Sequence, residues 1–205
     1  MHIRDTIGVY PNTLTDEQCD ELIAAFHEYK DYHYKGVVAM GYDKATKDTT
    51  DFNLLDVPEL QELTALVAEA ANEKVDLYVQ RYRTTEEFNT SEYLFGKGTY
   101  YPVWQLQRYE KGVGHFKSFH TEGEYKEFSN RLFAVMFYLN DVEEGGETEF
   151  LHQGLFVKPT KGTFLVWPAP WPYVHRGHVP ISDNKYILTT WLCRTEDDDD
   201  EFEEN

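Results

Sequence analysis

Apolar residues in the first half of the chain recur at helical spacing. Thr15-Asp-Glu-Gln18 reads as a capping box and precedes an apolar stripe, which predicts a helix ending near residues 29–30. A second helical pattern begins at Pro58 and extends to about residue 82. These two stretches predict supporting helices that pack on one face of a sheet.

The segments around these helices are more polar. Residues 7–10 predict a short strand, and residues 31–56 predict a loop with one short strand at residues 37–40. Residues 84–99 predict a second polar loop. Its position before the later strands is equally compatible with a substrate lid and with an ordinary surface loop.

From Val103 onward the pattern changes to short strands separated by Gly and Pro turns. Residues 103–109 alternate, which sets Gln105, Gln107 and Tyr109 on one face. Residues 131–139 are almost continuously apolar and predict a strand that is buried on both faces. Further strands are expected at residues 115–120, 148–151, 155–157, 163–167, 173–175 and 186–193. The pattern predicts a mainly β sandwich or barrel with flanking helices.

Length and charge limit the classes of protein to which this chain can belong. With 205 residues the chain predicts a single domain over residues 1–195, with helices in residues 1–83 and a β core in residues 103–194. Residues 196–205 carry eight acidic residues and no basic one, which predicts a disordered tail. The net charge of −18 disfavours free DNA or RNA as a partner, because nucleic-acid affinity depends on Lys and Arg.

The sequence also predicts a soluble cytoplasmic protein. It contains no apolar run long enough to span a membrane, and its first residues do not resemble a signal peptide. The two cysteines, Cys19 and Cys193, do not suggest a disulfide framework, so a reducing compartment is expected. No pattern in the sequence indicates an oligomeric state.

His120 and Glu122, together with the distant His175, are the candidate metal ligands. Residues i and i+2 of a strand share a face, so an imidazole and a carboxylate would point the same way. Two imidazoles and one carboxylate leave positions open on a metal, as non-haem Fe(II) oxygenases require. A structural zinc site would need four ligands, usually including thiolates.

Two other histidines compete for these roles. His115 has Lys117 at i+2, and a charged lysine cannot bind a metal, so His120 is preferred. His178 lies three residues after His175, so only one of the two can face the site. The sequence pattern alone leaves the choice between them open.

Several motifs occur in order and resemble the 2-oxoglutarate/Fe(II)-dependent dioxygenase family, in particular its prolyl 4-hydroxylase-like branch and phage-type relatives. The resemblance spans roughly residues 104–194. Its motifs are Arg108-Tyr-Glu-Lys-Gly112, His120-x-Glu122, Arg131 through Asn140, Gly145-Gly-Glu-Thr148-x-Phe150, Lys158-Pro-x-Lys-Gly162 and Trp171-Pro-Tyr-Val-His175-Arg-Gly177. Lys185 follows His175 by ten residues, the spacing of that branch, which selects His175 over His178.

The resemblance implies a double-stranded β-helix, that is, a jelly-roll or cupin-like core. It implies Fe(II) on His120, Glu122 and His175, and Lys185 paired with the far carboxylate of 2-oxoglutarate. Tyr109 and Tyr138 are expected to contact this co-substrate, and Trp191 to pack near it. O2 is the oxidant, succinate and CO2 are released, and ascorbate is an accessory reductant in this interpretation. The nearest branch points to a prolyl residue of a peptide or protein as substrate, with a small molecule as the alternative.

One residue departs from the resemblance. The branch most often has His-x-Asp, whereas this chain has Glu122, which is one methylene longer and still a carboxylate. A carboxylate at this position argues against a halogenase. Two alternatives remain at the level of sequence: a non-catalytic jelly-roll binding module, and a metal-dependent cupin without a co-substrate. An inward-facing Lys185 would separate the second of these from the dioxygenase.

Overall fold

The structure is a computed structural model that describes residues 6–38, 41–82, 85–96, 98–123 and 126–195. The α-helices are α1 (Asp16–Glu28), α2 (Gln61–Gln80) and α3 (Thr90–Phe95). The short 3-10 helices are η2 (Lys30–Tyr32), η3 (Leu54–Asp56), η4 (Pro58–Leu60) and η5 (Lys126–Phe128). The predicted tail at residues 196–205 lies outside the described residues.

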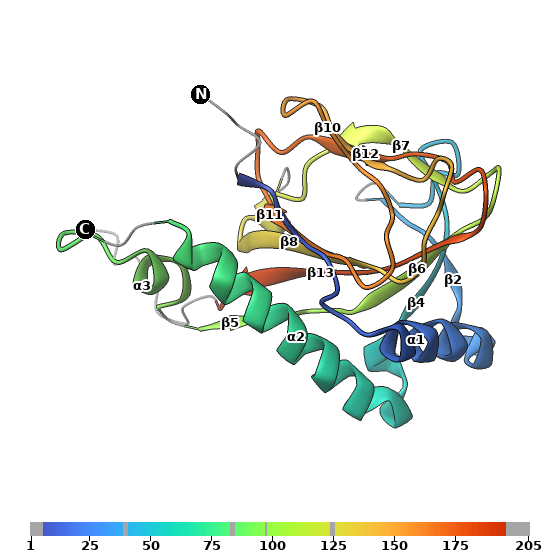
Figure 1. Ribbon diagram of the computed structural model, residues 1–205, viewed down its shortest axis with the longest axis horizontal. Coiled ribbons are helices and arrows are strands. Elements are labelled where there is room, and N and C mark those ends of the chain that lie inside the picture. The colour runs from blue at the N-terminus through green and yellow to red at the C-terminus, as the bar shows by residue number, and fades with distance from the viewer. Residues whose placement is uncertain (1–5, 39–40, 83–84, 97, 124–125, 196–205) are drawn as a thin grey trace, which may run out of the picture.

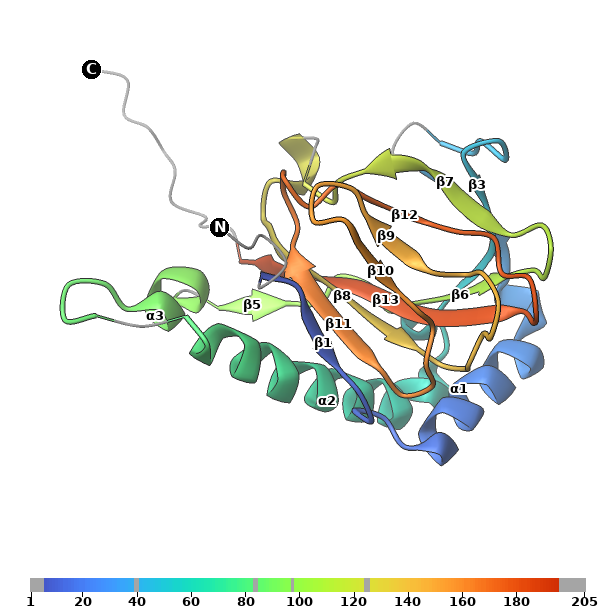
Figure 2. The same cartoon turned by 45° about the horizontal axis from the view of Figure 1, so that its top comes forward.

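Two antiparallel sheets face each other, as Figures 1 and 2 show. The larger has the order β1-β11-β8-β13-β6-β4-β2, with β5 added beside β13, and the smaller has the order β10-β9-β12-β7-β3. The larger sheet consists of β1 (Gly8–Tyr10), β2 (Tyr34–Lys35), β4 (Thr50–Asn53), β5 (Thr99–Tyr100), β6 (Gln105–Tyr109), β8 (Arg131–Tyr138), β11 (Phe164–Pro168) and β13 (Lys185–Arg194). The smaller consists of β3 (Lys47–Asp48), β7 (His115–His120), β9 (Thr148–Phe150), β10 (Leu155–Val157) and β12 (His175–Gly177). This confirms the predicted jelly-roll core with flanking helices.

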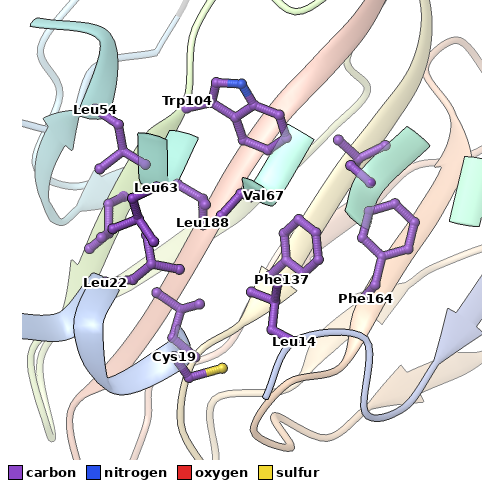
Figure 3. Packing of buried hydrophobic residues seen from close by; sticks show 14 of the residues in the cluster. Leu14, Cys19, Leu22, Leu54, Leu63, Val67, Trp104, Phe137, Phe164 and Leu188 are labelled. Atoms are coloured by element: carbon purple, nitrogen blue, oxygen red, sulfur yellow. The ribbon is translucent and has the colours of Figure 1, made fainter. Parts of the chain in front are cut away.

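The helices α1 and α2 lie on the outer face of the larger sheet (Figure 2). The predicted capping box of α1 is present, since Thr15 Oγ1 accepts from the Gln18 backbone N–H while Gln18 Oε1 accepts from the Thr15 N–H. Apolar side chains of both helices pack with the sheet in one buried cluster, part of which Figure 3 shows. Its members include Cys19, Leu22, Leu63, Val67, Phe137, Phe164 and Leu188. The two cysteines are buried and free.

The alternation of side chains along β8 divides the interior into two layers. Phe133, Val135 and Phe137 belong to the cluster under the helices. Ala134 and Met136 belong to a second cluster, between the two sheets. The continuous apolar run predicted for this strand therefore serves two cores, because each face of the larger sheet is covered.

Two local predictions are wrong. The strand predicted at residues 37–40 is not formed by the described part of that segment, where Val38 only bridges to Gly41. Strands form instead at β2, β3 and β4, and β4 joins β6 in the larger sheet. Their polar sequences carry little strand propensity, so pairing with neighbouring strands decides their conformation.

The segment predicted as a loop at residues 84–99 contains the helix α3. Asn89 caps it, since its side-chain oxygen accepts the Glu92 backbone N–H at 3.1 Å. This Asn89 cap was the sequence signal from which the helix could have been predicted. No helix among the described residues is long and apolar enough to cross a membrane.

Candidate active site

His120, Glu122 and His175 meet between the two sheets. His120 ends β7, His175 begins β12, and the two residues are direct partners across these strands. Glu122 lies two residues beyond β7, where its backbone N–H donates to the Ala169 carbonyl at 2.9 Å. Its Oε1 lies 3.3 Å from His175 Nε2 and 3.7 Å from His120 Nε2, and the three candidate ligand atoms lie within 4.8 Å of one another.

The backbone orients both imidazole rings in the same way. Nδ1 of His120 lies 2.9 Å from the Ser118 carbonyl oxygen, and Nδ1 of His175 lies 2.9 Å from that of Tyr173. We assign the ring proton to Nδ1 in each, because a carbonyl oxygen can only accept. The lone pair of each Nε2 then points toward Glu122, as metal-binding histidines are oriented by a carbonyl on the opposite nitrogen.

The protonation states suit a cation. Burial lowers the pKa of His175, and the neighbouring His120 lowers it further, so the imidazole stays neutral. Burial alone would raise the pKa of Glu122, but its contacts with the neighbouring His120 and His175 hold it well below its ordinary value, so the carboxylate is ionised. Two imidazole lone pairs and a carboxylate oxygen therefore face one another, an arrangement that a bound metal ion would stabilise.

These atoms open onto a cavity of about 580 Å³. One wall consists of paired residues on β13 and β6: Lys185 lies beside Tyr109, Ile187 beside Gln107 and Thr189 beside Gln105. The predicted alternation of residues 103–109 is confirmed, because Trp104 and Leu106 pack on the helix side.

Lys185 is buried in this wall, with 1% of its surface exposed. Its Nζ donates to the Gly146 carbonyl at 2.9 Å and lies 4.0 Å from the centre of the Tyr109 ring. No carboxylate of the described residues comes within 4 Å of this ammonium. Burial lowers the pKa of Lys185 to about 7. An anionic ligand in the cavity would restore the charged form.

The other three residues predicted to contact a co-substrate differ in position. Tyr109 lines the cavity, with its hydroxyl 3.3 Å from Gln107 Oε1. Tyr138 is fully buried but does not line the cavity; its hydroxyl lies 2.7 Å from Thr148 Oγ1 and 3.1 Å from the Val157 carbonyl. Thr148 lines the cavity in its place.

Trp191 lines the cavity, and its side chain contacts Glu122, one of the three candidate metal-binding residues. Its indole Nε1 donates to Glu122 Oε2 at 2.8 Å, a contact that the sequence did not suggest. Arg131 lies next to both residues and forms an internal ion pair with Glu122, with Nη1 3.6 Å from the same Oε2.

Neither competing histidine joins the cluster. His115 places Nδ1 2.7 Å from the Val113 carbonyl and Nε2 3.3 Å from that of Ala45. His178 Nε2 lies 2.7 Å from Glu149 Oε2. Among the described residues, the three predicted residues form the only group of three or more His, Cys, Asp or Glu side chains that could hold a metal ion.

Sequence reasoning missed a buried ion pair beside the cavity. Lys47 Nζ donates to Asp51 Oδ2 at 2.9 Å, and both residues are buried. Lys47 lines the cavity on β3, and Asp51 pairs with Gln107 across β4 and β6. Both residues belong to a polar, irregular segment, so their four-residue spacing alone gave no signal.

The lowered pKa of Lys185 leads to a prediction about how the stability of the ligand-free protein depends on pH. Folding depresses the pKa, so the folded protein binds fewer protons than the unfolded chain between about pH 7 and pH 10, and stability rises with pH there. At pH 6 we expect Lys185→Met to raise the free energy of unfolding by roughly 1–4 kcal/mol. Urea denaturation of both proteins from pH 6 to about pH 9.5 should show this difference shrink as pH rises. A pH-independent difference would contradict a buried, unpaired ammonium.

Comparisons with known proteins agree with this geometry. Residues 104–193 match the family model described as the 2OG-Fe(II) oxygenase superfamily. A prolyl 4-hydroxylase subunit alpha-2 from Caenorhabditis elegans is 36% identical over 84 residues, which are 41% of this chain and 14% of that protein. The chain thus spans only a small part of this relative.

Solved structures share the fold. A viral collagen prolyl hydroxylase from Paramecium Bursaria Chlorella virus-1, in complex with 2OG, has a TM-score of 0.64 at 20% identity, covering 93% of this chain and 97% of that one. A Trichoplax adhaerens prolyl hydroxylase, in complex with a hypoxia inducible factor peptide fragment, has a TM-score of 0.70 at 12% identity, covering 92% and 84%. Residues 104–193 are therefore similar to the 2OG-Fe(II) oxygenase superfamily, and the chain shares its fold with these prolyl hydroxylase structures.

Proposed function

We propose that this protein is an Fe(II)- and 2-oxoglutarate-dependent dioxygenase that hydroxylates an unactivated C–H bond. The observation that carries the proposal is the set of three metal-competent groups in the same cavity as a buried, unpaired ammonium. His120, Glu122 and His175 would hold the iron. Lys185 would hold the far carboxylate of 2-oxoglutarate, beside Tyr109 and Thr148.

When bound, Fe(II) and 2-oxoglutarate supply the oxidising chemistry: one oxygen atom of O2 enters the C–H bond as hydroxyl, and the other enters succinate as CO2 is released. The protein's own residues perform binding and orientation. The Ser118 and Tyr173 carbonyls fix the rings of His120 and His175. Lys185, once paired, fixes the direction in which the diacid lies.

The substrate side of the cavity supports a peptide as substrate. Gln105 and Gln107 present side-chain amides, with 3.3 Å between Gln107 Nε2 and Gln105 Oε1. Lys47 adds N–H donors, but its charge is balanced by Asp51. Such a wall is polar and locally neutral, which suits peptide carbonyl groups better than a charged small molecule. The Trichoplax relative was solved with a peptide.

The proposal includes a prolyl residue as the position that is hydroxylated, by likeness to the branch. We also keep the prediction of a reducing, cytoplasmic location, which the two free and buried cysteines support.

The first test is spectroscopic. Anaerobic addition of Fe(II) and 2-oxoglutarate to the purified protein should produce a weak metal-to-ligand charge-transfer band in the visible range. His175→Ala should abolish the band, because the metal loses one of three ligands. His178→Ala is the matched control and should keep it, since His178 faces Glu149 instead. A band that survives in His175→Ala would remove this residue from the site.

The second test concerns the co-substrate. Lys185→Met should raise the dissociation constant of 2-oxoglutarate by roughly 30- to 1000-fold, the cost of losing one partner of a buried charge pair. Titration of the charge-transfer band measures it. Lys158→Met, at an exposed position paired with Glu143, should leave the constant within about twofold. Equal constants for wild type and Lys185→Met would place the diacid elsewhere.

The third test concerns the substrate wall. Gln107→Leu keeps the approximate volume of the side chain but removes its amide. We expect the KM for a proline-containing peptide, such as poly-L-proline, to rise about tenfold, the effect of one or two lost hydrogen bonds. The dissociation constant of 2-oxoglutarate should rise much less than this, because Lys185 remains and only the contact between Gln107 and the Tyr109 hydroxyl is lost on that side. Peptide turnover with an unchanged KM would exclude Gln107 from substrate binding.

A further inference from the structure

The two carboxylate oxygens of Glu122 face different partners. Oε1 lies on the side of His120 and His175, at 3.7 and 3.3 Å from their Nε2 atoms. Oε2 accepts the indole N–H of Trp191 at 2.8 Å and lies 3.6 Å from Arg131 Nη1. Oε2 is thus held by one hydrogen bond and one ion pair, while Oε1 faces the imidazoles.

Arg131 is itself held in place. Its guanidinium lies between two aromatic rings, 3.7 Å from the ring centre of Trp191 and 3.8 Å from that of Phe128. Nη1 also donates to the backbone carbonyl of Glu122 at 3.0 Å. Trp191 and Arg131 therefore form a clamp on Glu122: both contact its side chain, and Arg131 also bonds its backbone carbonyl.

Glutamate needs such a clamp more than aspartate would. Its additional methylene adds one rotatable bond, so the carboxylate has more freedom to turn both oxygens toward a metal. A six-coordinate metal with two imidazoles and one carboxylate oxygen keeps three positions for other ligands. A carboxylate that binds through both oxygens leaves only two, which a chelating keto acid would fill completely.

We propose that Trp191 and Arg131 are positioning residues that hold Glu122 as a one-oxygen ligand and so keep the third position open. This inference rests on the proposed metal site and explains how a glutamate can stand where the branch most often has aspartate. Trp191 acts through its indole N–H, and Arg131 through its charge and its stacking on that indole.

The test uses Mn(II) alone, without 2-oxoglutarate, and counts water ligands from the broadening of its EPR lines in ¹⁷O-enriched water. The wild-type protein should hold three waters. Trp191→Phe removes the N–H but keeps a ring against Arg131, and we expect it to hold two waters because Oε2 loses its hydrogen-bond donor and can then bind the metal. Arg131→Leu is the second variant and should change the count in the same direction.

Trp167→Phe is the matched control. Trp167 also lines the cavity, but its indole Nε1 donates to no acceptor among the described residues, so the count of three should persist. With Fe(II) and 2-oxoglutarate, Trp191→Phe should lower kcat by roughly 10- to 100-fold while the dissociation constant of 2-oxoglutarate stays within about twofold.

The outcomes separate the two proposals. Two waters in the wild-type protein, or three in both variants, would overturn the clamp and leave the metal site intact. A wild-type protein that binds neither Mn(II) nor Fe(II) would overturn the proposed function and the clamp together. Near-UV circular dichroism identifies a variant that has not folded, in which case the other variant decides.

Discussion

The rest of the structure depends on one constraint: the fold must hold the candidate metal ligands and a lysine close together in a cavity where they do not stabilise one another. Two imidazole lone pairs and a carboxylate oxygen converge, and a lysine ammonium lies buried in the same cavity with no carboxylate of the described residues within 4 Å. This arrangement costs free energy when no ligand is bound, because two buried Nε2 lone pairs face a carboxylate oxygen and the ammonium has a neutral carbonyl rather than a carboxylate as its acceptor. The fold has to offset that cost elsewhere.

The offset comes from the opposite face of the same strands. In β13, Lys185 and Trp191 face the cavity, while Tyr186, Leu188 and Leu192 pack under the helices. The helix-side cluster is the larger of the two apolar cores and buries side chains from α1, α2 and the larger sheet (Figure 3). Since burial of apolar surface stabilises by about 25 cal/mol per Å², that layer can support a cavity wall whose residues are chosen for binding.

Periodicity predicted the strongly patterned parts of this fold. Three elements were predicted correctly because the local sequence pattern of each has one physical meaning. They are the capping box at Thr15, the helix after Pro58 and the two-faced strand at residues 131–139. The strands β2, β3 and β4 were missed because tertiary pairing alone makes them extended. The ion pair between Lys47 and Asp51 was missed with them, since its burial depends on those pairings.

The candidate site was likewise predicted from the sequence only in part. Strand alternation predicted that His120 and Glu122 would share a face, but only the family resemblance, through the spacing to Lys185, selected His175 over His178. What each neighbour does was not predictable: Trp191 was expected near a co-substrate, yet its polar edge is bonded to Glu122. Likewise Tyr138 was expected at the cavity, but its hydroxyl is bonded within the core, and Thr148 reaches the cavity. Contacts between side chains on different strands depend on rotamers, which a pattern of residue types does not specify.

The wall around Lys185 bears on the choice between an enzyme and a binding module. A jelly-roll module that binds its partner on an outer surface gains nothing from a buried lysine without a counter-charge, and a hydrophobic residue there would make it more stable. The same holds for a cupin that uses a metal without a co-substrate. An anion that enters the cavity turns this cost into affinity, because the ammonium then acquires a carboxylate within ion-pair distance, which none of the described residues supplies. The position of Lys185 therefore favours an enzyme site in which a diacid binds in every catalytic cycle.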